Sequence, residues 1–202
     1  MHDLLFWLKA NYIEVIGTLS GIAGVWLTTR QIIWCWPVSL VNVLCYVYVF
    51  FMTKLYADFG LQFFYLALIF YGWYHWIYGG KDRHELQVNR LSLKGFAIYF
   101  FTGSILTILT GILLARFTNA SLPFLDSFLG VWSIICTLLM AKKIVENWLI
   151  WVVVDGIYIG MYIYKGLYPT SILYLLYALI ALYGYFEWKK EYNKLNQAKF
   201  SA

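Results

Sequence analysis

Charged residues are scarce in this sequence. Asp, Glu, Lys and Arg account for 12% of the 202 residues, whereas soluble domains carry about 25%. Hydrophobic residues make up 62% of the chain, above the roughly 45–50% of soluble domains. This composition excludes an ordinary soluble domain and predicts an integral membrane protein.

Cysteine and histidine are also rare, with three of each. Cys35, Cys45 and Cys136 form no CxxC motif and have no His at ligand spacing, so we expect small packing residues, no metal site and no cofactor. The pair His84-Glu85 is not followed by the second His of a zinc protease, and no GxSxG motif is present. These absences predict that the chain is not an enzyme.

The first apolar run lacks the features of a cleaved leader. His2, Asp3 and Lys9 precede it without a basic start, and no small-residue cleavage site follows. We therefore expect a retained helix.

Long uncharged runs fill most of the chain. A helix needs about 20 apolar residues to cross a hydrocarbon core of roughly 30 Å, and seven segments approach this length. We predict an all-α fold with seven transmembrane helices, at about 13–29, 33–53, 59–79, 95–115, 125–141, 147–165 and 168–188.

The distribution of Lys and Arg predicts the orientation, because cytoplasmic loops carry the excess of these residues. Seven spans place Lys9, Lys54, Arg116 and Lys165 on the side of the N-terminus, and the other eleven of the 15 basic residues on the side of the C-terminus. The N-terminus is therefore expected outside and the C-terminus in the cytoplasm. Because the basic residues are dispersed over short loops, nucleic acid is not an expected partner.

The chain contains an internal repeat at one fixed offset, which superposes Trp36 on Trp148 without a gap. We call this spacing the repeat offset. The other informative matches are aromatic residues and one glycine: Tyr46 with Tyr158, Tyr56 with Tyr168, Tyr65 with Tyr177, Tyr71 with Tyr183, Gly72 with Gly184 and Trp76 with Trp188. An accidental match of aromatic-rich helices is the alternative, and it would leave the seven spans unchanged.

The repeat divides the chain into parts. We expect a first three-helix repeat at 1–80, a connector helix with its loops at 81–120, a second three-helix repeat at 121–190 and a cytoplasmic tail at 191–202. In this 3+1+3 arrangement both repeats enter the membrane in the same direction. Such parallel repeats occur in transporters that bind substrate near the midplane.

Four residues of the sixth span share one helix face: Trp148, Trp151, Asp155 and Tyr158, spaced 3, 4 and 3 residues apart. Asp155 lies about 12 Å along the helix from Asn147, near mid-bilayer. A carboxylate at this depth usually marks a pathway or a ligand site, although a structural hydrogen bond to a neighbouring helix is the alternative.

The second and third spans add candidate site residues: Trp36, Asn42, Gln62 and Tyr65. Together with the sixth span they predict an aromatic lumen with an amide and an acid, suited to a flat cationic solute. Tryptophans near span ends also form interface belts, and this alternative stays open for Trp36, Trp76 and Trp188. A structural hydrogen bond is the alternative for Gln62.

Several short segments of the sequence, including these residues, resemble those of a known family. The segment 146–151, ENWLIW, followed by Asp155, Tyr158 and the segment 165–168, KGLY, resembles the PnuC family of bacterial vitamin-precursor transporters, as do LYA at 55–57 with Gln62 and YGWY at 71–74 with Trp76. The resemblance covers about residues 15–190.

The resemblance implies a fold and a function. It implies a SWEET-like fold of seven helices, a homotrimer, and facilitated diffusion (uniport) of nicotinamide riboside across the bacterial inner membrane. A cytoplasmic kinase would then trap the substrate by phosphorylation. The family's WxxW motif falls on Trp148 and Trp151, which would pack against the pyridinium ring.

The family's NxxY motif falls on Asp155 and Tyr158, where this chain has Asp in place of Asn. An ionised carboxylate only accepts hydrogen bonds, whereas an amide also donates them. The carboxylate suits a ligand with donors and a positive charge, so thiamine is the alternative substrate. A seven-helix receptor or assembly protein that moves no solute is a less favoured alternative.

Overall fold

The computed structural model describes residues 11–54, 56–80 and 83–200. His2, Asp3 and Lys9, which precede the predicted first span at about 13–29, lie outside the described residues, as do Leu55 and Lys81. The described residues form seven α-helices: α2 (Tyr12–Thr29), α3 (Cys35–Met52), α4 (Tyr56–Tyr78), α5 (Leu93–Phe117), α6 (Pro123–Ala141), α7 (Asn147–Tyr164) and α8 (Tyr168–Phe200). The all-α prediction is therefore confirmed for this part of the chain.

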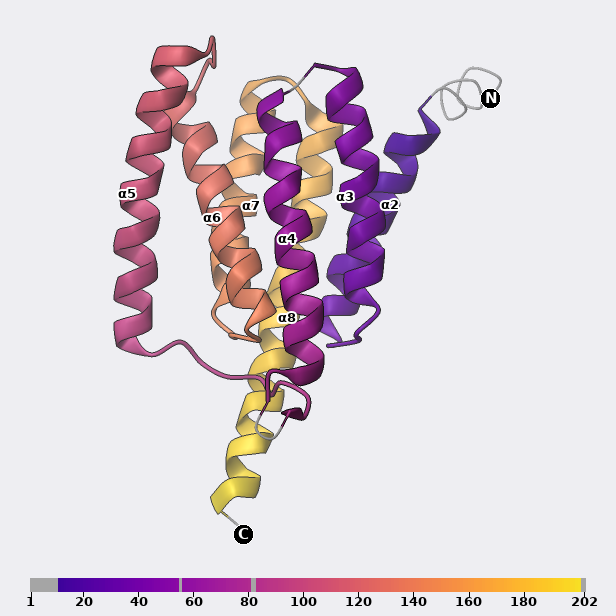
Figure 1. Ribbon diagram of the computed structural model, residues 1–202, viewed down its shortest axis with the longest axis vertical. Coiled ribbons are helices and arrows are strands. Elements are labelled where there is room, and N and C mark those ends of the chain that lie inside the picture. The colour runs from indigo at the N-terminus through magenta and orange to yellow at the C-terminus, as the bar shows by residue number, and fades with distance from the viewer. Residues whose placement is uncertain (1–10, 55, 81–82, 201–202) are drawn as a thin grey trace.

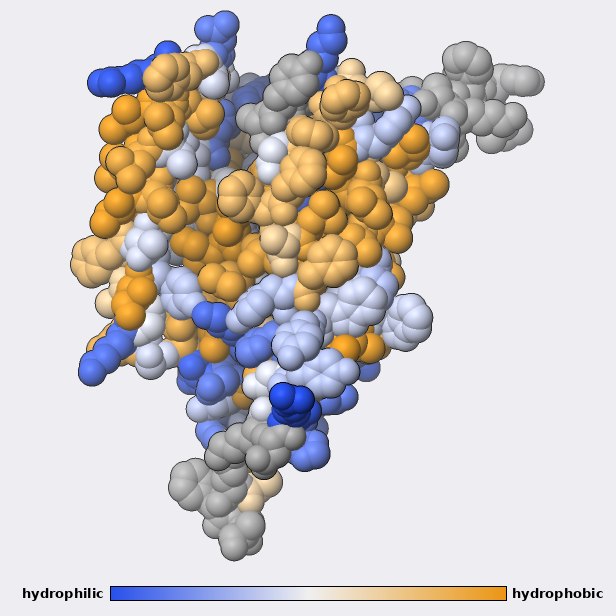
Figure 2. All heavy atoms as spheres, in the orientation of Figure 1, coloured by the Kyte–Doolittle hydropathy of each residue, from blue (hydrophilic) through white to orange (hydrophobic). Residues whose placement is uncertain are grey.

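Five of these helices are long and apolar enough to cross a membrane, namely α3, α5, α6, α7 and α8. The other two match predicted spans in position but have lower mean hydropathy. Helix α2 contains Glu14 with several Gly, Ser and Thr residues, and α4 is rich in Tyr and Trp. Figure 2 shows a wide hydrophobic zone over the helices, and below it hydrophilic residues gather at the end of the molecule that carries the C-terminus.

Contacts between neighbouring helices join six of the described helices into a closed ring. Helix α3 packs between α2 and α4, α7 packs between α6 and α8, and the ring is closed by contacts of α4 with α6 and of α8 with α2. Helix α5 packs against α6 from outside. The ring leaves room for a central cavity between the two groups of three helices.

The helix bounds follow the repeat offset. At this offset the first and last residues of α3, Cys35 and Met52, fall on the first and last residues of α7, and the start of α4 falls on the start of α8. Left-handed backbone also recurs at this offset, with φ of 56° at Gln31 and 50° at Lys143, and 59° at Lys54 and 72° at Gly166. Left-handed backbone is uncommon outside glycine. Its recurrence at the repeat offset is therefore informative, and it supports the repeat independently of the sequence matches.

Helix α2 packs against α3 through small residues. A Cβ built at Gly17 would lie 3.1 Å from Cβ of Cys45, and one built at Gly24 would lie 2.8 Å from Oγ of Ser39. Small residues let helices in membranes approach closely, so the glycines on this face let α2 lie close to α3.

Residues 83–92 join α4 to α5 beneath the ring (Figure 1). Asn89 pairs with the turn between α6 and α7: its N–H donates to the carbonyl of Lys143, and its carbonyl accepts from the N–H of Val145. Arg90 Nε lies 2.8 Å from Glu146 Oε1, and the hydrogen bond and charge of Glu146 raise the pKa of Arg90. The connection from α4 to α5 is thus fixed to the second group of three helices.

Helix α8 is longer than the predicted seventh span, which ends at 188. It continues to Phe200, because Glu, Lys, Gln and Ala are good helix formers in water as well as at the membrane surface.

Candidate functional site

A cavity of about 550 Å³ lies inside the ring and is lined by residues from all six of its helices. This volume is within the range of about 300–1,000 Å³ that is usual for small-molecule sites. The structure places every predicted site residue on the cavity wall: Trp36, Asn42, Gln62, Tyr65, Trp148, Trp151, Asp155 and Tyr158.

Most of the wall is built from residues that correspond at the repeat offset. The pairs are Gly21 with Ser133, Val25 with Thr137, Thr28 with Met140, Trp36 with Trp148, Ser39 with Trp151, Val43 with Asp155, Tyr46 with Tyr158, Phe50 with Tyr162, Gln62 with Tyr174, Tyr65 with Tyr177 and Ile69 with Ala181. The two groups of three helices therefore present equivalent faces to one cavity, with different chemistry at several pairs.

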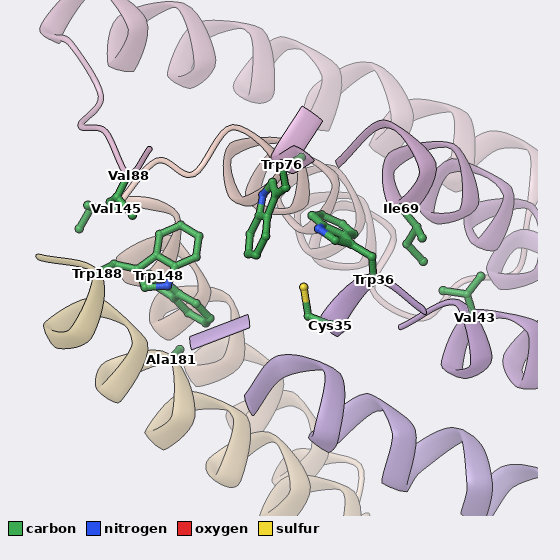
Figure 3. Packing of buried hydrophobic residues seen from close by; sticks show 11 residues of the cluster. Cys35, Trp36, Val43, Ile69, Trp76, Val88, Val145, Trp148, Ala181 and Trp188 are labelled. Carbon is green, nitrogen blue, oxygen red and sulfur yellow. The ribbon is translucent and has the colours of Figure 1, made fainter. Parts of the chain in front are cut away.

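Trp36 and Trp148 lie at the end of the cavity nearer the C-terminus, and each is 1% exposed. Trp76 and Trp188 pack beside them at 2% and 0% exposure (Figure 3). The interface-belt interpretation of Trp36, Trp76 and Trp188 is therefore wrong. These side chains point into the ring, where they bury much more apolar area than at a lipid surface.

Asp155 differs most from its counterpart, which is Val43. Its side chain is 3% exposed, and within residues 11–54, 56–80 and 83–200 it has no recorded hydrogen bond or ion pair, so the alternative of a structural hydrogen bond has no support. Buried charges are normally paired, because an unpaired charge loses its hydration without compensation. The carboxylate is available to a ligand in the cavity.

Tyrosines form the wall next to Asp155. The ring centroids of Tyr158 and Tyr174 are 4.3 Å apart and nearly parallel, and Tyr177 meets Tyr174 edge to face at 6.0 Å. Rigid aromatic faces of this kind bind flat rings and attract cations.

The two predicted amide residues differ in role. Gln62 is buried on the cavity wall at 7% exposure. Asn42 also lines the cavity, but its Nδ2 donates to the carbonyl of Gly17 at 2.7 Å. The Asn42 amide thus connects α3 to α2, which leaves its carbonyl oxygen for other partners.

The sequence prediction missed polar residues on α2 and α6. Ser133 and Thr137 line the cavity on α6, and Glu14 lines it near the start of α2. Ser133 and Thr137 are four residues apart in an apolar span, so a search for polar pairs on one helix face would have found them. Glu14 gave no such signal, because it stands near the end of its helix.

The charge of the cavity restricts its ligand. Among the described lining residues the charged side chains are Glu14 and Asp155, and neither Lys nor Arg is present. A neutral or cationic solute fits this wall, whereas an anion would meet two carboxylates without a counter-charge.

Comparison with known proteins gives a consistent result. The family described as nicotinamide mononucleotide transporter matches residues 11–190. The nicotinamide riboside transporter PnuC of Escherichia coli (strain K12) is 29% identical over 203 aligned residues, covering 88% of this chain and 85% of that protein. The riboflavin/roseoflavin transporter RibM of Streptomyces davaonensis is 24% identical over 182 residues, covering 87% and 83% of the two chains.

A solved structure shows the same fold. The crystal structure of the vitamin B3 transporter PnuC superposes with a TM-score of 0.75 at 22% identity, and the match covers 96% of this chain and 87% of that chain. The relatives are transporters, so the expectation of a multi-pass membrane transporter and not an enzyme is confirmed. The chain belongs to the nicotinamide mononucleotide transporter family and is a relative of the PnuC proteins.

Proposed function

We propose that this protein transports nicotinamide riboside across the membrane. The observation that carries the proposal is the aromatic cavity, in which Trp148 and Trp151 line a wall that has no basic residue among the described lining residues. The PnuC relatives are named for the same substrate, which has a flat pyridinium ring and a hydroxylated ribose.

In the proposed complex, the pyridinium ring stacks on Trp148 and Trp151. Asp155 supplies the counter-charge, and an aromatic face adds about 0.5–2 kcal/mol per cation contact. Tyr158 and Gln62 offer hydrogen-bonding groups to the ribose or the carboxamide, and Trp36 and Tyr65 close the opposite wall. Asn42 keeps its bond to Gly17 and offers its carbonyl oxygen.

The proposed architecture is a 3+1+3 parallel repeat of seven transmembrane helices. Residues 1–80 and 121–190 form the repeats, 81–120 holds the connector helix, and 191–202 is the tail. The matching bounds of α3 and α7, the matching starts of α4 and α8, and the paired cavity residues support it. The excess of Lys and Arg on the side of the C-terminus supports a cytoplasmic C-terminus in the bacterial inner membrane.

The proposed mechanism is uniport by alternating access. One three-helix repeat moves against the other around the central site, so that the cavity opens to each side in turn. Such a transporter only equalises concentrations, so net uptake needs a cytoplasmic kinase that phosphorylates the riboside. The proposed assembly is a homotrimer, as the family resemblance implies.

Thiamine is the second candidate substrate, and Asp155 is the observation that favours it. A carboxylate accepts hydrogen bonds from an aminopyrimidine and balances a thiazolium charge, whereas an asparagine supplies no charge. The relative named for riboflavin and roseoflavin supports the view that cavities of this fold accommodate different ring systems.

The mononucleotide in the family description is disfavoured as the substrate. Its phosphate would face Glu14 and Asp155, and the described part of the wall offers it no cation. The same carboxylates favour the unphosphorylated riboside.

Isothermal titration of the purified protein with nicotinamide riboside, thiamine and nicotinamide mononucleotide tests the proposal. We expect the riboside to bind at least tenfold more tightly than the mononucleotide. Tight binding of thiamine alone would replace the first substrate by the second. Binding of none of the three would remove the proposed function and leave the receptor or assembly alternative.

A further inference from the structure

Two tryptophan indoles connect the first repeat (α2, α3 and α4) to the second (α6, α7 and α8) by crossed hydrogen bonds. Nε1 of Trp76 on α4 donates to the carbonyl of Met140 on α6 at 3.2 Å. Nε1 of Trp188 on α8 donates to the carbonyl of Thr28 on α2 at 3.1 Å. The two donors correspond at the repeat offset, and so do the two acceptors, so the bonds are equivalent and run in opposite directions between the repeats.

Each accepting carbonyl also receives a backbone bond from a left-handed residue. The N–H of Gln31 donates to Thr28 at 3.0 Å, and the N–H of Lys143 donates to Met140 at 2.9 Å. Both donors lie in the turns that end α2 and α6, with φ of 56° and 50°. The sharp turns hold the last carbonyls of both helices in place for the indoles.

The four tryptophans form a continuous layer across the ring (Figure 3). The centroid distances are 5.3 Å from Trp36 to Trp76, 5.9 Å from Trp76 to Trp188 and 5.4 Å from Trp188 to Trp148. Trp36 and Trp148 face the central cavity. A second cavity of about 400 Å³, lined by residues such as Gln31, Glu85, Lys143 and Glu191, lies toward the C-terminus.

The layer lines the central cavity through Trp36 and Trp148, and Lys143 of the second cavity lies 4.6 Å from the ring centroid of Trp76. Trp76 and Trp188, the two middle members of this row, do not line the central cavity. Trp76 contacts Trp36 edge to face at an interplanar angle of 86°, and Trp188 contacts Trp148 in the same way at 90°.

We propose that Trp76 and Trp188 are positioning residues that form a gate. In this gate the two crossed hydrogen bonds hold the central cavity closed at its end nearer the C-terminus. This inference rests on the proposed transport function. Movement of one repeat against the other lengthens both bonds together, because each bond joins α2 or α6 to a helix of the opposite repeat. The gate therefore opens as a unit.

The two bonds differ in one respect. Nζ of Lys143 lies 4.6 Å from the ring centroid of Trp76, and the residue that corresponds to Lys143 at the repeat offset is the neutral Gln31. A cation over an indole face adds attraction. Trp76 thus has one more contact with the opposite repeat than Trp188, so its replacement has the larger effect on opening.

Cys35 is a native reporter of the gate. It is 1% exposed and packs in the same cluster as the four tryptophans (Figure 3). Cys136 is 0% exposed and lies outside that cluster and outside the cavity wall. A local opening exposes Cys35 alone, whereas general loosening of the fold exposes both thiols.

The test is the rate of N-ethylmaleimide labelling at each cysteine, read by mass spectrometry of the full-length protein in proteoliposomes. The variants are Trp76→Phe and Trp188→Phe, which keep an aromatic ring and lose the N–H. Trp34→Phe is the matched control, because Trp34 is 66% exposed and outside the layer. No substrate is added, so the result is independent of which solute is carried.

We expect labelling of Cys35 to rise about three- to tenfold in each variant, as for the loss of one hydrogen bond between membrane helices, with the larger rise in Trp76→Phe. Labelling of Cys136 and of the control stays at the wild-type rate. An unchanged rate at Cys35, or an equal rise at Cys35 and Cys136, would overturn the gate. Failure of nicotinamide riboside to bind would instead overturn the proposed function and leave this result standing.

Discussion

The indole of Trp148 lies directly on Gly184. A Cβ built at Gly184 would come within 2.7 Å of Cε2 of Trp148, and Gly72 has the equivalent contact with Trp36. These two glycines let the cavity tryptophans lie against α8 and α4, so the floor of the cavity depends on the absence of two methyl groups.

We therefore expect Gly184→Ala and Gly72→Ala each to weaken binding of nicotinamide riboside and to lower the melting temperature. Forcing an extra methyl group into a packed core costs about 1–3 kcal/mol. Gly130→Ala on α6 is the control, because a Cβ there meets no atom within 4 Å. Titration and thermal unfolding in detergent measure both effects. Equal behaviour of the three variants would show that the tryptophans move aside freely.

We propose that Asp155 controls the choice between substrates. Asp155→Asn removes the charge and restores a hydrogen-bond donor, so it should shift the ratio of uptake rates toward nicotinamide riboside and away from thiamine by about tenfold. Asp126→Asn, on α6 but not on the cavity wall, should leave the ratio unchanged. If Asp155→Asn also leaves the ratio unchanged, Asp155 does not face the substrate.

Gly166 and Gly160 form a matched pair for backbone strain. Neither has an atom within 4 Å of a built Cβ, but Gly166 has a φ of 72°. Left-handed backbone costs other residues about 1–2 kcal/mol, whereas alanine is favoured over glycine by about 1 kcal/mol inside a helix. Gly166→Ala should therefore lower the free energy of unfolding and Gly160→Ala should raise it. Unfolding in denaturant compares them, and a stabilised Gly166→Ala would contradict the assigned conformation.

Much of the fold follows from the sequence because two signals agree. Apolar runs locate the helices, and the repeat offset pairs them, so the predicted span 147–165 nearly coincides with α7 (Asn147–Tyr164). The runs could not show how far α8 extends, since a charged helix in water has no apolar signal. They also could not show that residues 83–92 pair with the turn at Lys143, because that pairing depends on contacts between distant segments.

The site was predictable where a polar residue interrupts an apolar helix, as at Asp155. It was not predictable for Trp76 and Trp188 of the tryptophan layer, because the same residue type at a span end suits lipid headgroups and a packed core equally well. The crossed bonds of Trp76 and Trp188 depend on which carbonyls the neighbouring helices present, and backbone carbonyls leave no trace in the sequence.

Uptake of labelled nicotinamide riboside into proteoliposomes that hold the wild-type protein, with no ion gradient and no membrane potential, tests the central claim most directly. The account predicts entry faster than into empty vesicles, with a plateau at equal internal and external concentrations. Entry no faster than into empty vesicles would contradict transport of the riboside, and accumulation above the external concentration would contradict uniport.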